Sequence, residues 1–157
     1  MRIPRVYLES TIFNFVFADD APDKKQDTLR LFDEIRQGNY EPYTSLYVLR
    51  ELNLTQGEKR TMMTDLIDEY GVTIIDATAE AERLADIYVA AGIIPEKYAT
   101  DALHIACASV TDMDFITSWN FKHIVKRKTI VLTEAVNAQQ GYKRIGIYSP
   151  TEVIESE

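Results

Sequence analysis

The sequence has one cysteine, Cys107, and two histidines among its 157 residues. A single cysteine excludes an intrachain disulfide and a zinc site built from several thiolates. We therefore expect a reduced, cytoplasmic setting, where thiols stay unpaired. Cys107 alternates with small residues in an apolar segment, so it is expected to be buried and unreactive.

Long apolar runs are also missing from the chain. No stretch approaches the roughly 20 apolar residues that a membrane-spanning helix needs, so no membrane association is expected. The opening residues, MRIPRVYLES, lack the apolar run and cleavage site of a signal peptide. Neither G-x-G-x-x-G nor a P-loop is present, which disfavours a metabolic α/β enzyme with a nucleotide cofactor.

The composition is that of an ordinary folded domain, with 46% hydrophobic and 27% charged residues. Apolar residues are spread along the whole chain, which excludes extensive disorder. The length suits one hydrophobic core. We therefore expect a single domain over residues 1–157.

Charge is distributed unevenly along the sequence. The chain carries a net charge of -8, yet residues 122–144 hold six basic residues and one acidic residue, Glu134. On bulk charge alone, nucleic acid would be a poor partner. The basic segment leaves two interpretations open, a solvated edge or a surface that contacts phosphates.

Short apolar segments alternate with helical periodicity. Strands are predicted at 5–8, 42–44, 72–75 (as a buried strand), 114–118, 129–132 and 145–148, and residues 11–17 fit either a strand or a buried helix. Helices are predicted from Pro22 to Gly38, from an N-cap at Ser45 through Leu52, from a capping box at Thr55 and Glu58 to Gly71, from an N-cap at Thr78 to Gly92, and from Pro95 to about Val110. This alternation predicts an α/β domain with a mainly parallel sheet.

Sites in such sheets form outside the carboxyl ends of the strands. Glu9 directly follows the first predicted strand, and Asn120 follows the strand at 114–118. Glu51 lies on the helix after the second strand. These positions predict that polar side chains gather at one edge of the sheet.

Asp101 lies inside the most apolar helix of the chain. A buried ionised carboxylate needs a partner, because its desolvation costs several kcal/mol. Lys97, four residues earlier, or backbone N–H groups could supply one. The other interpretation is a hard divalent cation, Mg²⁺ or Mn²⁺, shared with other carboxylates.

Four segments together resemble the PIN-domain family of metal-dependent nucleases, which includes VapC-type toxin ribonucleases. They are YLESTIF (7–13), SLYVLREL (45–52), DALHIACA (101–108) and ITSWNFKHIV (116–125). The resemblance implies a three-layer α/β/α sandwich around a mainly parallel sheet. It also implies RNA hydrolysis with Mg²⁺ or Mn²⁺.

Carried over by position, the resemblance makes Glu9, Glu51 and Asp101 the metal-binding acids. Asn120 takes the fourth catalytic position, and the hydroxyls of Ser10 and Ser118 orient ligands or water. The family most often has aspartate where this chain has Glu9 and Asn120. Because an amide adds no negative charge, we expect one metal ion or weak metal binding.

The resemblance also bears on partners. We expect RNA as substrate, with positive charge beside the acidic pocket supplied by four basic residues: Lys122, Lys126, Arg127 and Lys128. An antitoxin protein and a homodimer are further expectations from the family. The alternative is a catalytically weakened, nucleic-acid-binding PIN domain without the fourth acid. His104 and Trp119 are expected mainly as packed residues.

Overall fold

A five-stranded, all-parallel sheet forms the centre of the molecule. The computed structural model describes residues 2–154, and its strands lie in the order β3-β2-β1-β4-β5. The strands are β1 (Arg5–Leu8), β2 (Glu41–Ser45), β3 (Thr73–Ile75), β4 (Phe115–Thr117) and β5 (Gly146–Tyr148). Tyr7 of the central strand pairs with Tyr43 on one side and Ile116 on the other. The first strand of the sequence is therefore the middle of the sheet.

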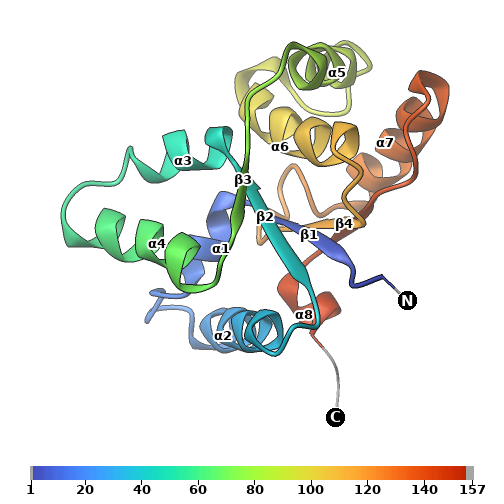
Figure 1. The fold of residues 1–157 in the computed structure, drawn as a ribbon. Helices are drawn as coiled ribbons and strands as arrows, with labels where there is room; N and C mark the ends of the chain where they lie inside the picture. Colours follow the sequence, from blue (N-terminus) through green and yellow to red (C-terminus); the bar gives the residue numbers. More distant parts are fainter. Residues whose placement is uncertain (1, 155–157) are drawn as a thin grey trace.

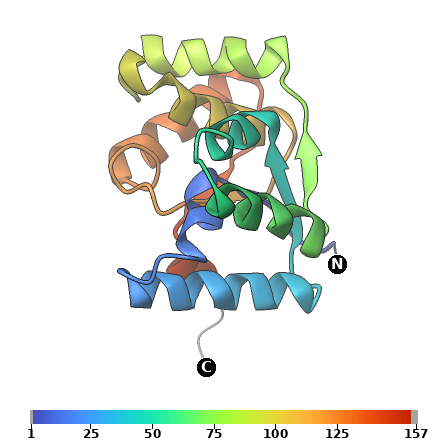
Figure 2. The ribbon, with the colours of Figure 1, turned by 90° about the vertical axis from the view of Figure 1, so that its left-hand side faces the viewer.

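Helices cover both faces of this sheet (Figure 1). They are α1 (Ser10–Phe15), α2 (Pro22–Arg36), α3 (Leu46–Leu52), α4 (Glu58–Glu69), α5 (Ala79–Ala90), α6 (Ala99–Val110), α7 (Arg127–Gln140) and α8 (Pro150–Val153). Helices α2 and α8 pack together on one side, and α5 packs along α6 on the other. Figure 2 shows α2 and α5 at opposite sides of the molecule. The predicted three-layer α/β/α sandwich is confirmed.

Burial is deepest where β1 meets α6. Val6, Tyr7 and Leu8 are fully buried, as are Ala102 and Ile105 of α6. Strands covered on both faces read as continuous apolar runs, which is why RVYL has no polar alternation. This arrangement fixes β1, which Glu9 follows, against α6, which carries Asp101.

Two predicted helix starts are confirmed by their hydrogen bonds. The Ser45 hydroxyl accepts from the backbone N–H of Val48, and the Thr78 hydroxyl accepts from that of Ala81. Such caps satisfy N–H groups that the first turn leaves without partners. Residues 11–17, open between strand and helix, belong largely to α1.

The predicted strand at 129–132 is wrong, because these residues lie in α7. Thr129, Thr133 and Val136 are buried at helical spacing on one face. The helix ends at Gly141, which adopts the left-handed conformation that closes helices. Tertiary packing of this face overrides the β preference of Thr, Ile and Val.

The capping box at Thr55 and Glu58 is also wrong. Gly57, at φ 77°, is the N-cap of α4 and makes no side-chain capping bond. Thr55 lies in the turn after α3, and its backbone N–H donates to the carbonyl of Leu52. The helix itself is present, with its start at Glu58 rather than Thr55.

Two further expectations need correction in part. Residues 73–75 do form a strand, but β3 lies at the edge of the sheet and Ile74 is exposed, so it is not a buried strand. Pro95 precedes a short 3₁₀ turn, Glu96–Tyr98, and α6 starts only at Ala99.

Between residues 2 and 154, none of the helices has both the length and the apolar character that a bilayer span requires.

Candidate metal and nucleic-acid site

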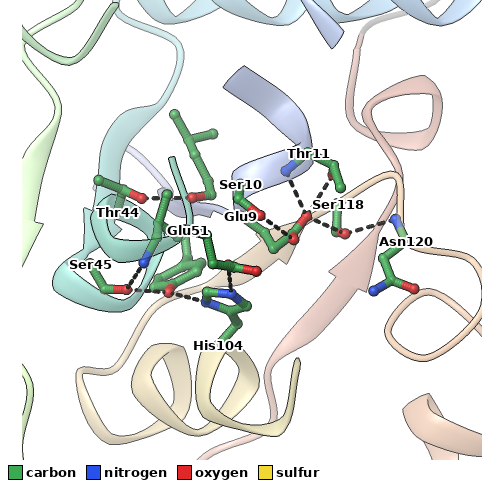
Figure 3. Close-up of polar contacts among 12 residues, drawn as sticks. Glu9, Ser10, Thr11, Thr44, Ser45, Glu51, His104, Ser118 and Asn120 are labelled. Carbon is green, nitrogen blue, oxygen red and sulfur yellow. Dashed lines mark hydrogen bonds and ion pairs between the residues drawn. The ribbon is translucent and has the colours of Figure 1, made fainter. Parts of the chain in front are cut away.

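The carboxyl ends of the parallel strands bring the predicted polar residues to one edge. Glu9 directly follows β1, and Ser118 directly follows β4. Strand β2 runs straight into α3, the helix that carries Glu51. Segments far apart in the sequence therefore contribute side chains to one place, as Figure 3 shows.

Glu9 is a buried carboxylate held by its neighbours. Its side chain is the N-cap of α1 and accepts from the backbone N–H of Thr11 at 3.1 Å. The hydroxyls of Thr11, Ser118 and Ser10 donate to it at 2.5, 2.7 and 2.9 Å (Figure 3). These donors hold the carboxyl group of a residue that is only 2% exposed.

Glu51 is held by a histidine. The Nε2 atom of His104 lies 2.5 Å from a carboxylate oxygen of Glu51. Burial raises the pKa of Glu51, but the hydrogen bond and charge of His104, with help from Ser10, lower it overall. Burial conversely lowers the pKa of His104, and Glu51, Glu9 and Asp101 raise it overall. A lowered pKa for Glu51 and a raised pKa for His104 are the shifts that an ion pair between them produces.

The far side of the His104 ring is fixed by Tyr7. The Tyr7 hydroxyl lies 2.8 Å from Nδ1 of His104 and 2.6 Å from the Ser45 hydroxyl. Burial raises the pKa of Tyr7 well above its usual value, so the phenol stays protonated. The Tyr7 hydroxyl therefore links the His104 ring to the Ser45 hydroxyl. The chain of bonds orients the ring that orients Glu51.

Asp101 lies beside this pair in the first turn of α6. Burial chiefly raises its pKa to about 6, with His104 opposing and the negative charges of Glu9 and Glu51 adding to the rise. A side-chain hydrogen bond from Asn120 acts in the opposite direction. Asp101 is thus a crowded carboxyl group that a nearby cation would relieve.

Asn120 lies beside Asp101, and its side chain acts to lower the pKa of that carboxyl group. Its side-chain oxygen accepts from the backbone N–H of His123 at 2.9 Å. Its own backbone N–H donates to the Ser118 hydroxyl. These two bonds fix Asn120 in the loop after β4.

The alternative partner for Asp101, Lys97, does not pair with it. Among residues 2–154, no ion pair within 4.0 Å joins these two side chains. Lys97 instead places its ammonium 5.8 Å from the ring centre of Tyr98. The carboxyl of Asp101 therefore stays available at the site.

Three side chains come together most closely. Ligand atoms of Glu9, Glu51 and His104 lie within 4.8 Å of one another. Asp101 falls outside that group, although it interacts electrostatically with all three. Two converging carboxylates with a third nearby suit a hard divalent cation. Both ring nitrogens of His104 already have partners, so the ring is better placed to hold Glu51 than to bind metal.

Sequence reasoning treated His104 as a packed residue, and its burial and hydrogen bonds bear that out. Its link to Glu51 was missed. Three positions after Asp101, His104 shares one helical face with it, which was the available signal. The partner, Glu51, lies 53 residues away and could not be found from spacing.

One of the three acids, Glu51, reaches open space. A cleft of about 380 Å³ adjoins Glu51 and Ser10, between α1, α3 and α4, with Asn14 and Lys59 also in its wall. On the other side, Asn120 leads into the loop before α7. A substrate can therefore approach Glu51 without rearrangement of the core.

The predicted basic residues divide into two groups. Lys122, Lys126, Arg127 and Lys128 are exposed around the start of α7 and have no carboxylate within 4.0 Å among the described residues. Lys143 and Arg144 instead pair with Asp114 and Glu134. Asp114 precedes β4, at the opposite edge of the sheet. Only the first group lies near Asn120 in the chain.

Comparisons with known proteins identify the fold. No known family model matches the chain, and no curated protein does. A chain in the crystal structure of VapBC2 from Rickettsia felis, bound to a DNA fragment from their promoter, superposes with a TM-score of 0.51. It is 21% identical, and the match covers 75% of this chain and 89% of that one. The expected PIN-like fold is therefore confirmed.

Proposed function

We propose that this protein is a metal-dependent endoribonuclease that hydrolyses RNA phosphodiester bonds. The observation that carries the proposal is the convergence of Glu9, which follows β1, with Glu51 of α3, and the position of Asp101 of α6 near enough to interact with both. Carboxylates so close together repel one another without a cation. Their retention in a PIN-like fold supports a catalytic role.

Mg²⁺ or Mn²⁺ would be held by Glu9, Glu51 and Asp101. When bound, such an ion supplies an activated water and stabilises charge on the phosphate. Glu9 is already oriented by Ser10, Thr11 and Ser118. Because these hydroxyls need not reorganise, Glu9 presents its charge at a fixed place.

The remaining residues hold the other two acids. His104 positions Glu51, and the side chain of Asn120 acts to lower the pKa of Asp101. Asn120 keeps the fourth position neutral, so the site carries less negative charge than one with four acids. One bound ion is the stoichiometry that this charge favours.

RNA, a polyanion, must approach an acidic chain. Lys122, Lys126, Arg127 and Lys128 would supply the attraction from the loop beyond Asn120 and the start of α7. That loop is tied down, because the carbonyl of Asn120 accepts from the N–H groups of Ile124 and Val125. The basic residues are thereby anchored to the same segment as the acidic site.

Cleavage of a labelled RNA pool tests the proposal. Wild type with Mn²⁺ should cut, a chelator should stop it, and Asp101→Asn should cut at least about a hundredfold more slowly. The matched control is Asp65→Asn, which removes one exposed carboxylate from α4. If neither the wild type nor Asp101→Asn cuts RNA, while both still bind it, the alternative function holds.

That alternative is a nucleic-acid-binding domain with weakened catalysis. Its support is Asn120, which has an amide in place of a carboxylate and whose side-chain oxygen already accepts from the backbone N–H of His123. Asn120→Asp separates the two cases. Gain of Mn²⁺-dependent cleavage only in this variant would show that the natural chain binds RNA without cutting it.

A toxin of a toxin–antitoxin pair is the finer form of the proposal. The similar fold belongs to a VapBC2 structure on promoter DNA, which supports an antitoxin partner here. An antitoxin that covers the cleft beside Glu51 would inhibit cleavage when co-expressed with this chain. A homodimer is likewise proposed, and light scattering of the purified protein would test it.

A further inference from the structure

Phe121 places a large exposed aromatic ring directly after Asn120. It is 47% exposed, whereas the neighbouring Trp119 is only 7% exposed. The two rings meet edge to face, with centroids 6.1 Å apart and planes at 78°. Phe121 therefore has a supported edge and an accessible surface, which is what a stacking platform requires.

Trp119 is fixed and cannot turn outward without losing its bonds. Its indole N–H donates to the Thr28 hydroxyl at 2.8 Å, and its backbone N–H donates to the Thr11 hydroxyl at 2.8 Å. Trp119 thus supports Phe121 as a packed residue. The ring available to a ligand at this place is Phe121.

Lys24 of α2 reaches the same aromatic group. Its ammonium lies 5.4 Å from the ring centre of Phe15, 5.6 Å from that of Trp119 and 5.4 Å from that of Phe121. No carboxylate lies within 4.0 Å of it among residues 2–154. In a chain of net charge -8, such a cation, held only by ring faces, has capacity for an anion.

This group connects directly to the acidic site. The Thr11 hydroxyl that accepts from Trp119 also donates to Glu9. Asn120, which lies beside Asp101, is the residue before Phe121. Thr11 therefore links Trp119 to Glu9. Phe121 is joined by one peptide bond to Asn120, the neighbour of Asp101.

We propose that Phe121 and Lys24 form a subsite for one nucleotide of single-stranded RNA. The base stacks on the exposed surface of Phe121, and Lys24 contacts a neighbouring phosphate. Aromatic stacking plus a cation is the chemistry that binds unpaired nucleotides without sequence preference. This inference rests on the proposed ribonuclease function, because it assumes RNA at the acidic site. It adds that the RNA is unpaired there.

Binding without cleavage tests the stacking half. A labelled single-stranded RNA and its matched duplex are titrated in chelator, with fluorescence anisotropy as readout. Phe121→Leu should weaken single-strand binding about tenfold, and Phe121→Tyr should restore it, because stacking contributes about 1–3 kcal/mol per base. Ile74→Ala, on the exposed edge strand, removes comparable exposed apolar surface as a control.

Two adjacent lysines test the phosphate contact. Lys24→Ala should lower the salt dependence of binding by about 0.7 in log–log slope, the value for one phosphate on a single strand. Lys25→Ala removes the same charge from a lysine that pairs with Asp19 at 2.5 Å, and should leave the slope nearly unchanged. Fluorescence of Trp119, the sole tryptophan, should change on RNA binding and not in Phe121→Leu.

The outcomes separate this inference from the proposed function. Equal single-strand affinity of wild type, Phe121→Leu and Lys24→Ala, with cleavage intact in wild type, overturns the subsite alone. Duplex binding as tight as single-strand binding also overturns it. A wild type that neither binds nor cuts RNA removes the ribonuclease function itself. Circular dichroism confirms that each variant is folded.

Discussion

His104 and Glu51 form a pair across the site, with Nε2 2.5 Å from the carboxylate oxygen. One member is fully buried and the other is half-buried. Tyr7 fixes the remaining ring nitrogen. The orientation of Glu51 therefore depends on residues of β1 and α6 that never meet substrate.

Removing the hydrogen bond between Tyr7 and the His104 ring should lower the stability of the protein. Tyr7→Phe leaves Nδ1 of His104 and the Ser45 hydroxyl without their common partner. A buried polar group that loses its hydrogen bond lowers the free energy of unfolding by about 1–3 kcal/mol. Urea unfolding should show a loss in that range. Tyr40→Phe removes a hydroxyl whose bond to the Val153 carbonyl is only part-buried, and should lose less. Equal losses would contradict the special role of Tyr7.

The His104–Glu51 pair should also set a pH window. The pKa of His104 is raised, so its contribution is complete below pH 6.5 and is lost as pH rises through the folded value. The pKa of Glu51 is lowered, so its contribution is present above pH 4.5 and is lost in acid. Stability relative to His104→Gln should therefore peak between these limits. A difference independent of pH would contradict the ion pair.

Asp101→Asn should stabilise the metal-free protein. The raised pKa of Asp101, about 6, means that ionisation is disfavoured on folding, so stability falls as pH rises from about 4 to 6. Above that range the variant avoids this cost, and we expect a gain of about 1 kcal/mol in urea unfolding at pH 7.5. The gain should disappear near pH 4. A less stable variant at pH 7.5 would contradict the assignment.

The start of α7 should show opposite effects on stability and binding. Lys126, Arg127 and Lys128 place cations at a helix N-terminus, where each is unfavourable by about 0.3–1 kcal/mol. Reversing all three to Glu should raise the melting temperature and weaken RNA binding together. The affinity of this variant for RNA should also depend less steeply on salt concentration. Weaker binding with a lower melting temperature would indicate simple damage to the fold.

Much of this fold is readable in the sequence, because its signals are local. The alternation of strands and helices, the caps at Ser45 and Thr78, and Glu9 and Asn120 at strand ends all lie within a few residues of the elements they define. Residues 129–132 were predicted as a strand because three of them are β-branched, but only Thr129 among them lies on the buried face of α7. That face exists only once α7 has docked.

The site was less accessible to sequence reasoning. Glu51 and His104 meet across 53 residues, and Lys24 reaches Phe121 from another layer of the fold. Such contacts depend on the packing of the sheet and helices, which periodicity does not encode. The resemblance identifies the acids, but only the structure shows that the side-chain oxygen of Asn120 accepts from the N–H of His123.

Calorimetric titration of Mn²⁺ into the wild type, Glu9→Gln, Glu51→Gln and Asp101→Asn tests the shared cation site most directly. The wild type and the Asp65→Asn control should each bind one Mn²⁺ per chain. Each acid substitution should weaken binding at least about tenfold, the equivalent of 1.4 kcal/mol. Wild-type affinity in all three variants, or no binding by the wild type, would contradict a site shared by these acids.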